Sequence, residues 1–207
     1  VVDWLRSQGD GRPSGVAAVR TGVTQTQFEA DVRRIQEYIA AGDTYQVNHT
    51  WRLDFDAYGN PADLYARLRR RQRVPYGAYI TLPEGRTVLS RSPELFVRHT
   101  AGELRAKPMK GTAPACTDDA QNLEQARALA ADPKNRAENV MIVDLMRNDL
   151  GRLARQGTVK VPALFEVERF GEVLQMTSTV QAQLRPDCGL AQIFGALYPC
   201  GSIPGAP

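Results

Sequence analysis

The chain has 207 residues, of which 43% are apolar and 24% are charged. This composition is that of a globular protein and excludes a disordered chain, and the length allows one sizeable domain or a large piece of one. The net charge of +3 is too small to indicate a nucleic-acid partner, and the chain has no run of about 18 apolar residues that would span a membrane. The three widely spaced cysteines form neither a pair motif nor a disulfide framework, so we expect reduced thiols and a cytoplasmic location.

The two ends of the chain carry little structural signal. Residues 1–24 are rich in glycine and polar side chains and predict a loop or linker. The start shows neither an initiator Met nor a signal peptide, and the last residues lie inside a glycine-rich loop. We therefore expect a fragment truncated at both ends, with one domain over residues 25–207.

The first half of this domain begins with a helix. The helix is predicted from Thr26, with Glu29 completing a capping box and Gly42 ending it. Residues 45–55 alternate between apolar and polar side chains and predict a strand with one buried face. A second helix follows Asn60-Pro61 and carries a run of arginines, which fits a solvated helix face or a nucleic-acid patch. The absence of interleaved aromatic residues favours the solvated face.

The second half predicts strands and helices in mixed order. Strands are expected near residues 76–82, 87–90, 94–99, 103–107, 158–161 and 172–184, and helices near 123–131, 136–151 and from Leu190 toward Tyr198. Because the strands follow no regular βαβ repeat, the pattern indicates an α+β fold.

The stretch Ser90-Arg-Ser-Pro-Glu94-Leu-Phe places a carboxylate directly after a rigid proline and before apolar side chains. A carboxyl group in such surroundings has a raised pKa and is suited to proton transfer. The same pattern also fits a surface glutamate at a turn.

The stretch Lys107-Pro-Met-Lys110-Gly-Thr112 combines an amine with a small residue and a hydroxyl. Gly111 would let a ligand approach the backbone closely, and Lys110 would be a nucleophile if a dry pocket lowered its pKa. An exposed turn lysine is the alternative interpretation.

Residues 135–152 predict an apolar helix with charged side chains embedded in it, and we expect this helix to be mostly buried. Asp144 and Arg147 are three residues apart and can pair along the helix. Glu138 has no obvious local cation. It is therefore a candidate Mg²⁺ ligand, with a structural salt-bridge network as the alternative.

The last stretch, Cys200-Gly-Ser202-Ile-Pro-Gly205, is a glycine-rich turn after a helix. The backbone N–H groups of such a turn can hold a carboxylate or a phosphate. It is equally consistent with a plain turn.

Taken in this order, the stretches resemble the chorismate-utilising enzymes, which include the anthranilate, aminodeoxychorismate, isochorismate and salicylate synthases. The resemblance covers about residues 25–207 and implies an α+β fold with two packed antiparallel sheets flanked by helices. It also implies a Mg²⁺-dependent active site. The matching segments are Tyr45-Gln-Val-Asn48, Ser92-Pro-Glu94, Pro108-Met-Lys-Gly-Thr112, residues 135–149 and Gly201-Ser202.

Two positions discriminate within this family. Lys110 stands where anthranilate synthases carry Ala, and a Lys there marks the aminodeoxychorismate synthases. The resemblance implies that Lys110 attacks carbon 2 of chorismate and expels the carbon-4 hydroxyl, after which ammonia adds at carbon 4 and releases the lysine. Gln46 stands where the water-adding isochorismate-type relatives carry a base lysine. The implied product is 4-amino-4-deoxychorismate, a precursor of 4-aminobenzoate and folate, and the implied ammonia donor is a glutamine amidotransferase subunit.

The resemblance also implies roles for the remaining motif residues. Glu94 would transfer a proton at the departing hydroxyl, and Glu138 would be one Mg²⁺ ligand. The substrate pocket would be formed by Gln46, Gly111, Thr112, Arg147, Arg152, Gly201 and Ser202.

Some features limit these expectations. Gln175 replaces a His that many relatives have, which puts a protonating role at that position in doubt. The chain stops before the family's second metal-binding segment, so we expect it to be inactive alone. The alternatives are an anthranilate synthase component I and a non-catalytic fragment that docks an amidotransferase or serves in regulation.

Overall fold

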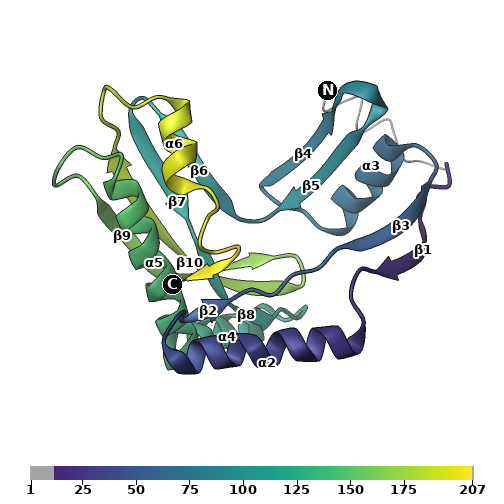
Figure 1. The fold of residues 1–207 in the computed structure, drawn as a ribbon, viewed down its shortest axis with the longest axis horizontal. Helices are drawn as coiled ribbons and strands as arrows, with labels where there is room; N and C mark the ends of the chain where they lie inside the picture. The colour runs from purple at the N-terminus through teal and green to yellow at the C-terminus, as the bar shows by residue number, and fades with distance from the viewer. Residues whose placement is uncertain (1–11, 207) are drawn as a thin grey trace. The chain divides into compact units, whose positions relative to one another are not determined.

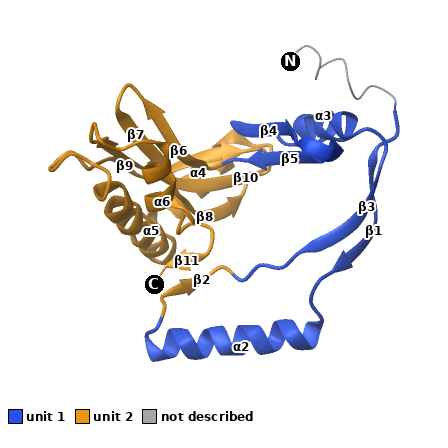
Figure 2. Ribbon diagram, turned by 45° about the horizontal axis from the view of Figure 1, so that its top comes forward, with its two compact units in different colours: residues 1–43, 49–93 blue, residues 44–48, 94–207 orange. Residues whose placement is uncertain are grey.

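The computed structural model describes residues 12–206, and their contacts divide the chain into two compact units (Figure 2). The first unit comprises residues 1–43 and 49–93, and the second comprises residues 44–48 and 94–207. The single domain predicted over residues 25–207 is thus divided between both units. The predicted α+β class is confirmed, because helices are interspersed with runs of strands whose pairings in the described chain are all antiparallel (Figure 1).

The described residues of the first unit form two small sheets and two α-helices. Strands β1 (Gly15–Thr21) and β3 (Leu53–Tyr58) pair with each other, as do β4 (Tyr76–Thr81) and β5 (Thr87–Ser92). The helices are α2 (Gln25–Ala41) and α3 (Pro61–Arg71), and a short 3-10 turn spans Pro83–Gly85. The expected loop over residues 1–24 is wrong for β1, and residues 1–11 lie outside the described part.

The start of α2 differs from the prediction. The N-cap is Thr24, whose hydroxyl accepts a hydrogen bond from the backbone N–H of Gln27 at 3.2 Å. The predicted start at Thr26, which rested on a capping box with Glu29, is therefore wrong by two residues. The predicted end is confirmed, since Gly42 adopts a left-handed φ of 81° after the last turn.

The strand predicted over residues 45–55 is interrupted. It forms β2 (Gln46–Val47) in the second unit and β3 in the first, with irregular backbone between them. The expected buried face is wrong, because Trp51, Leu53 and Phe55 are 47%, 53% and 49% exposed. Trp51 packs instead within an aromatic cluster with Phe28 and His49.

The second unit is built around a five-stranded sheet with the order β6–β7–β10–β8, in which β9 also pairs with β10. The strands are β6 (Leu95–Thr100), β7 (Glu103–Lys107), β8 (Met109–Pro114), β9 (Lys160–Phe170) and β10 (Val173–Gln183). A separate short pair joins β2 to β11 (Gly205–Ala206). The helices are α4 (Asp119–Ala131), α5 (Pro133–Gly151) and α6 (Leu190–Leu197).

One face of β10 carries the core of this unit. The side chains on this face are buried, as strand geometry requires for a face covered by helices, and Thr177 and Thr179 of the opposite face are buried as well. The residues of the core face are Leu174, Met176, Ser178, Val180 and Ala182. The first two pack with Leu129 of α4, and the last two join the cluster that includes Ile142, Met146 and Leu150 of α5.

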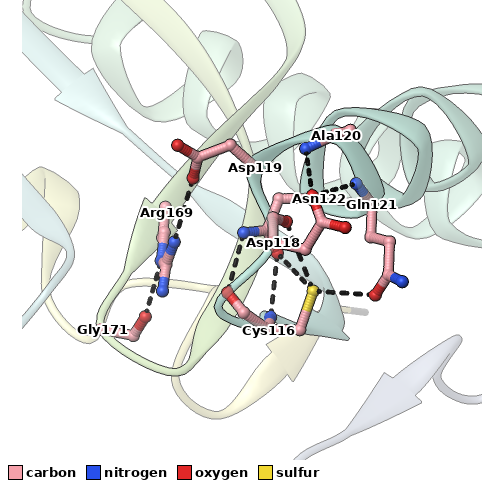
Figure 3. A network of polar contacts seen from close by, with 8 residues as sticks. All are labelled: Cys116, Asp118, Asp119, Ala120, Gln121, Asn122, Arg169 and Gly171. Carbon is pink, nitrogen blue, oxygen red and sulfur yellow. Dashed lines mark hydrogen bonds and ion pairs between the residues drawn. The ribbon is translucent and has the colours of Figure 1, made fainter.

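The start of α4 is fixed by a polar network at the loop that follows β8 (Figure 3). Asp118 is the N-cap and accepts a hydrogen bond from the N–H of Ala120 at 2.8 Å. Asn122 is buried; its side chain accepts from the N–H of Cys116 at 2.9 Å and donates to the Cys116 carbonyl at 2.8 Å. This side chain therefore replaces a backbone partner and holds the loop against the helix.

Helix α5 is less buried than the sequence predicted. Its buried residues are Asn139, Ile142, Val143, Met146 and Leu150, which lie on one face. Val140, which the sequence placed in the core, is 38% exposed. The helix covers a sheet with one side only, so the apolar residues of its other side remain accessible. None of the helices in the described part is long and apolar enough to cross a membrane.

Candidate active site

Lys110 lies on β8, a strand that the sequence did not predict because Pro108 and Gly111 interrupt its pattern. The residue is half-buried, and its Nζ is 3.5 Å from Oδ1 of Asn48. The pairing of β8 with β10 is irregular here: Gln175 lies opposite Thr112, but Thr177 lies opposite Met109. Lys110 and Gly111 thus lie within a bulge, a feature that re-aims side chains.

Glu94 immediately precedes β6 and lies in the same unit as Lys110. Burial raises the pKa of its carboxyl group above the ordinary value, although three interactions act in the opposite direction. These are a hydrogen bond from the Ser202 hydroxyl, the positive charge of Lys110 and a hydrogen bond from the backbone of Met109. The structure therefore brings three of the predicted site residues together, namely Glu94, Lys110 and Ser202.

Asn48 joins Lys110 to the glycine-rich turn. Its Nδ2 donates to the carbonyls of Ser202 and Ile203 at 3.0 and 2.8 Å, and its backbone N–H donates to the Pro204 carbonyl at 2.8 Å. Since both amide protons are used on carbonyls, Oδ1 is the atom that faces the amine of Lys110. The sequence did not single out Asn48, although it ends the matching segment Tyr45-Gln-Val-Asn48.

The turn itself depends on small residues. Gly201 is buried, and a Cβ there would lie 3.2 Å from Cγ of Leu145 on α5 and would overlap its methyl group. Ser202 is only 7% exposed. Gln46 pairs with Ala206 across the β2–β11 pair, and its buried Oε1 has no hydrogen-bond partner among the described residues.

Gly111 and Thr112 extend the site along β8. Gly111 has a φ of 97°, and a Cβ there would lie 3.2 Å from atoms of Asn135 and of Met176. A side chain at this position would therefore be strained by its positive φ and tightly packed against α5 and β10. The exposed Thr112 hydroxyl donates to Oε1 of Gln175 at 3.1 Å.

The other predicted site residues lie elsewhere on α5. Arg147 is exposed and pairs with Asp144 at 2.8 Å, as predicted for residues three apart. Arg152 is the exposed C-cap of the helix, and within the described residues neither arginine contacts Lys110. Their role in shaping a pocket stays a prediction.

Glu138 is half-buried and has no hydrogen bond or ion pair within the described part of the chain. That part also contains no group of three His, Cys, Asp or Glu side chains that could hold a metal. A single carboxylate with water and substrate oxygens is a common Mg²⁺ arrangement, so the donor fits this ion.

The resulting arrangement supplies an amine, a carboxyl group with a raised pKa, and a fixed amide and hydroxyl around them. Such a set can attack an electrophilic carbon with the amine and donate a proton to a leaving oxygen. The neutral residue that faces the Lys110 amine, Asn48, was missed because an amide carries no charge pattern in a sequence.

Comparisons with known proteins identify the family of the chain. Residues 6–207 match the family described as chorismate binding enzyme, and the chain belongs to this family. A curated relative, aminodeoxychorismate synthase component 1 of Klebsiella aerogenes, is 44% identical over 92% of this chain and 42% of its own length. Anthranilate synthase component 1 of Streptomyces coelicolor is 40% identical over 93% of this chain and 38% of its own length.

The fold is also that of solved members of the family. The crystal structure of anthranilate synthase component I from Streptococcus pneumoniae superposes with a TM-score of 0.84 and 28% identity, covering 93% of this chain and 42% of that one. This chain spans about two fifths of the length of the curated relatives that it matches.

Proposed function

We propose that this chain carries the nucleophile-bearing part of an aminodeoxychorismate synthase component I. Such an enzyme replaces the carbon-4 hydroxyl of chorismate with an amino group. The observation that carries the proposal is the position of the Lys110 amine beside the carboxyl group of Glu94 and the amide of Asn48. The chain is almost as similar to the Streptomyces coelicolor anthranilate synthase component as to the Klebsiella aerogenes aminodeoxychorismate synthase component. Overall identity therefore does not separate the two activities, and we base the choice on Lys110.

The residues perform the proposed reaction in two displacements. In the first, the Lys110 amine, in its unprotonated form, forms a bond to ring carbon 2. Both ring double bonds shift toward carbon 4, and the carbon-4 oxygen departs as water with a proton taken from Glu94. The upward shift in the pKa of Glu94 favours the protonated form that this step requires. In the second, ammonia forms a bond to carbon 4, both double bonds shift back, and Lys110 leaves carbon 2 as the free amine. A proton from the new ammonium group returns to Glu94.

Substrate binding would use the surrounding groups. Gln46, Gly111, Thr112, Gly201 and Ser202 are proposed to line the pocket, and Glu138 to hold Mg²⁺. When bound, Mg²⁺ supplies positive charge that offsets a carboxylate of the dianionic substrate. The component 1 name of the relatives supports a glutamine amidotransferase subunit as the ammonia source. The three free cysteines fit the cytoplasm.

The test is identification of the product by mass. The complete gene product is incubated with chorismate, ammonium and Mg²⁺, together with its Lys110→Ala variant and, as a control, its Lys160→Ala variant, which removes an exposed lysine of β9. The proposal predicts aminodeoxychorismate from the unmodified protein and from the Lys160 variant, and none from the Lys110 variant. Anthranilate would assign the protein to the other activity, and no product would favour a docking or regulatory role.

A further inference from the structure

The backbone of the bulge that carries Lys110 is held by one buried amide. Nδ2 of Asn139, on α5, donates to the carbonyl of Lys110 at 3.3 Å and to the carbonyl of Met176 at 3.4 Å. These carbonyls belong to β8 and β10, the two strands whose register shifts at this point. The amide therefore joins both sides of the irregularity.

The orientation of this amide is itself fixed. The Ser178 hydroxyl donates to Oδ1 of Asn139 at 2.5 Å and accepts from the backbone N–H of Phe165 at 3.1 Å. Phe165 has a left-handed φ of 59° in β9, so its N–H lies at a second irregularity, between β9 and β10. Because Oδ1 accepts from Ser178, the two amide protons must face the carbonyls.

The whole connection is removed from water. Asn139 is 1% exposed and Ser178 is 0% exposed, so neither side chain can exchange its partners for solvent. An unsatisfied buried polar group is costly, which makes the two bulges and the helix one interdependent unit. Residue 139 also follows Glu138 directly, so the same helical turn places both groups relative to Lys110.

We propose that Asn139 is a positioning residue for the Lys110 nucleophile. It holds the bulge in the geometry that presents the amine to Glu94 and Asn48. This inference rests on the proposed function for its catalytic consequence, but the predicted effect on the position of Lys110 is independent of any reaction.

The chain offers a matched control in Asn122, a second buried asparagine of the same unit that uses its amide to hold backbone groups. Its network, at the start of α4, does not include Lys110 (Figure 3). Asn139→Ala and Asn122→Ala should both lower the stability of the protein. Only Asn139→Ala should change the position and accessibility of the Lys110 amine.

The test measures the rate at which each lysine is labelled by reductive methylation, mapped by peptide mass in the complete gene product. In Asn139→Ala we expect labelling of Lys110 to be several-fold faster, with labelling of Lys160 unchanged, at a temperature where circular dichroism shows both variants folded. Asn122→Ala should leave both rates unchanged. Unchanged labelling of Lys110 in Asn139→Ala, or equal acceleration in both variants, would overturn the proposal.

Kinetics provide the second measurement. Misplacing a reacting group by about 1 Å costs up to about a hundredfold in rate, so kcat should fall by at least about tenfold in Asn139→Ala while KM for chorismate changes little. Ser178→Ala should have a smaller effect, and the double variant should be less impaired than the product of the two single effects predicts. A rise in KM with unchanged kcat would contradict positioning. An unmodified protein that makes no aminodeoxychorismate, with Lys110 labelling changed as expected, would refute the proposed function alone.

Discussion

Replacement of Gly205 with Ala tests how closely β11 approaches β2. Gly205 has a φ of 124°, where an L-amino acid is strained by about 1–3 kcal/mol. An added Cβ would overlap the carbonyl oxygen of Gln46 and lie 2.7 Å from its carbon and 3.0 Å from Cα of Val47. These are backbone atoms of a paired strand, so relief requires a backbone shift that costs about 1–3 kcal/mol more.

The total expected loss is therefore about 2–6 kcal/mol, a large share of the 5–15 kcal/mol that stabilises a typical domain. Gly157→Ala is the matched control, because Gly157 also has a positive φ, of 74°, but no atom lies within 4 Å of its added Cβ. Gly157→Ala should therefore lose only the free energy of the backbone strain, without the cost of a backbone shift.

The assay is urea denaturation of the complete gene product and both variants, followed by circular dichroism, with midpoints compared at an unchanged slope. Gly205→Ala should have the lower midpoint. It should also weaken the proposed activity, since β2 leads directly into Asn48. Equal midpoints for the two variants would refute the close approach and with it the account of how Asn48 is placed.

Three further substitutions test the energetics of the second unit. Because burial raises the pKa of Glu94, ionisation of this carboxyl group lowers the stability of the protein as pH rises through that pKa. The melting temperature of Glu94→Gln should therefore rise relative to that of the unmodified protein as pH increases. A difference in melting temperature that stays constant with pH would contradict this. Burial also raises the pKa of Glu168, but hydrogen bonds from Lys107 and Thr177 outweigh it and hold the pKa below its ordinary value. Glu168→Gln should lose about 0.5–1 kcal/mol of unfolding free energy at neutral pH, and less as pH falls through the pKa of Glu168. An equal loss at low pH would contradict a stabilising ion pair between Lys107 and Glu168. Leu104 is fully buried, so Leu104→Ala should cost about 2–5 kcal/mol in the same denaturation assay, and a loss below about 1 kcal/mol would contradict its place in the core.

The sequence predicted the regular parts of the fold well. Helix α3, with its N-cap Asn60, and strands β4 to β7 were located within a few residues because their caps, turns and periodicity are local signals. Strand β8 was missed because a proline and a glycine interrupt it, and a bulge of this kind is stabilised by contacts from distant segments.

The difference between local signals and contacts from distant segments also applies to the candidate site. Glu94 and Lys110 were predicted because their stretches match motifs of the chorismate-utilising enzymes, and the structure places the two residues together. The environment of α5 was predicted less well, because composition does not show that the helix contacts its sheet with one side only. Asn139, whose side chain holds the backbone at Lys110, is an uncharged amide whose hydrogen-bond partners lie on two strands distant in sequence, β8 and β10.

The most direct test of the central claim is the covalent state of Lys110 during turnover. The complete gene product is mixed with chorismate and Mg²⁺ without ammonia, quenched in acid, digested, and analysed by mass spectrometry. The account predicts that the peptide containing Lys110 gains the mass of chorismate less one water, and that addition of ammonium before the quench removes this adduct. Formation of aminodeoxychorismate with Lys110 unmodified at every time point, or by the Lys110→Ala variant at the unmodified rate, would contradict the assignment of Lys110 as the nucleophile.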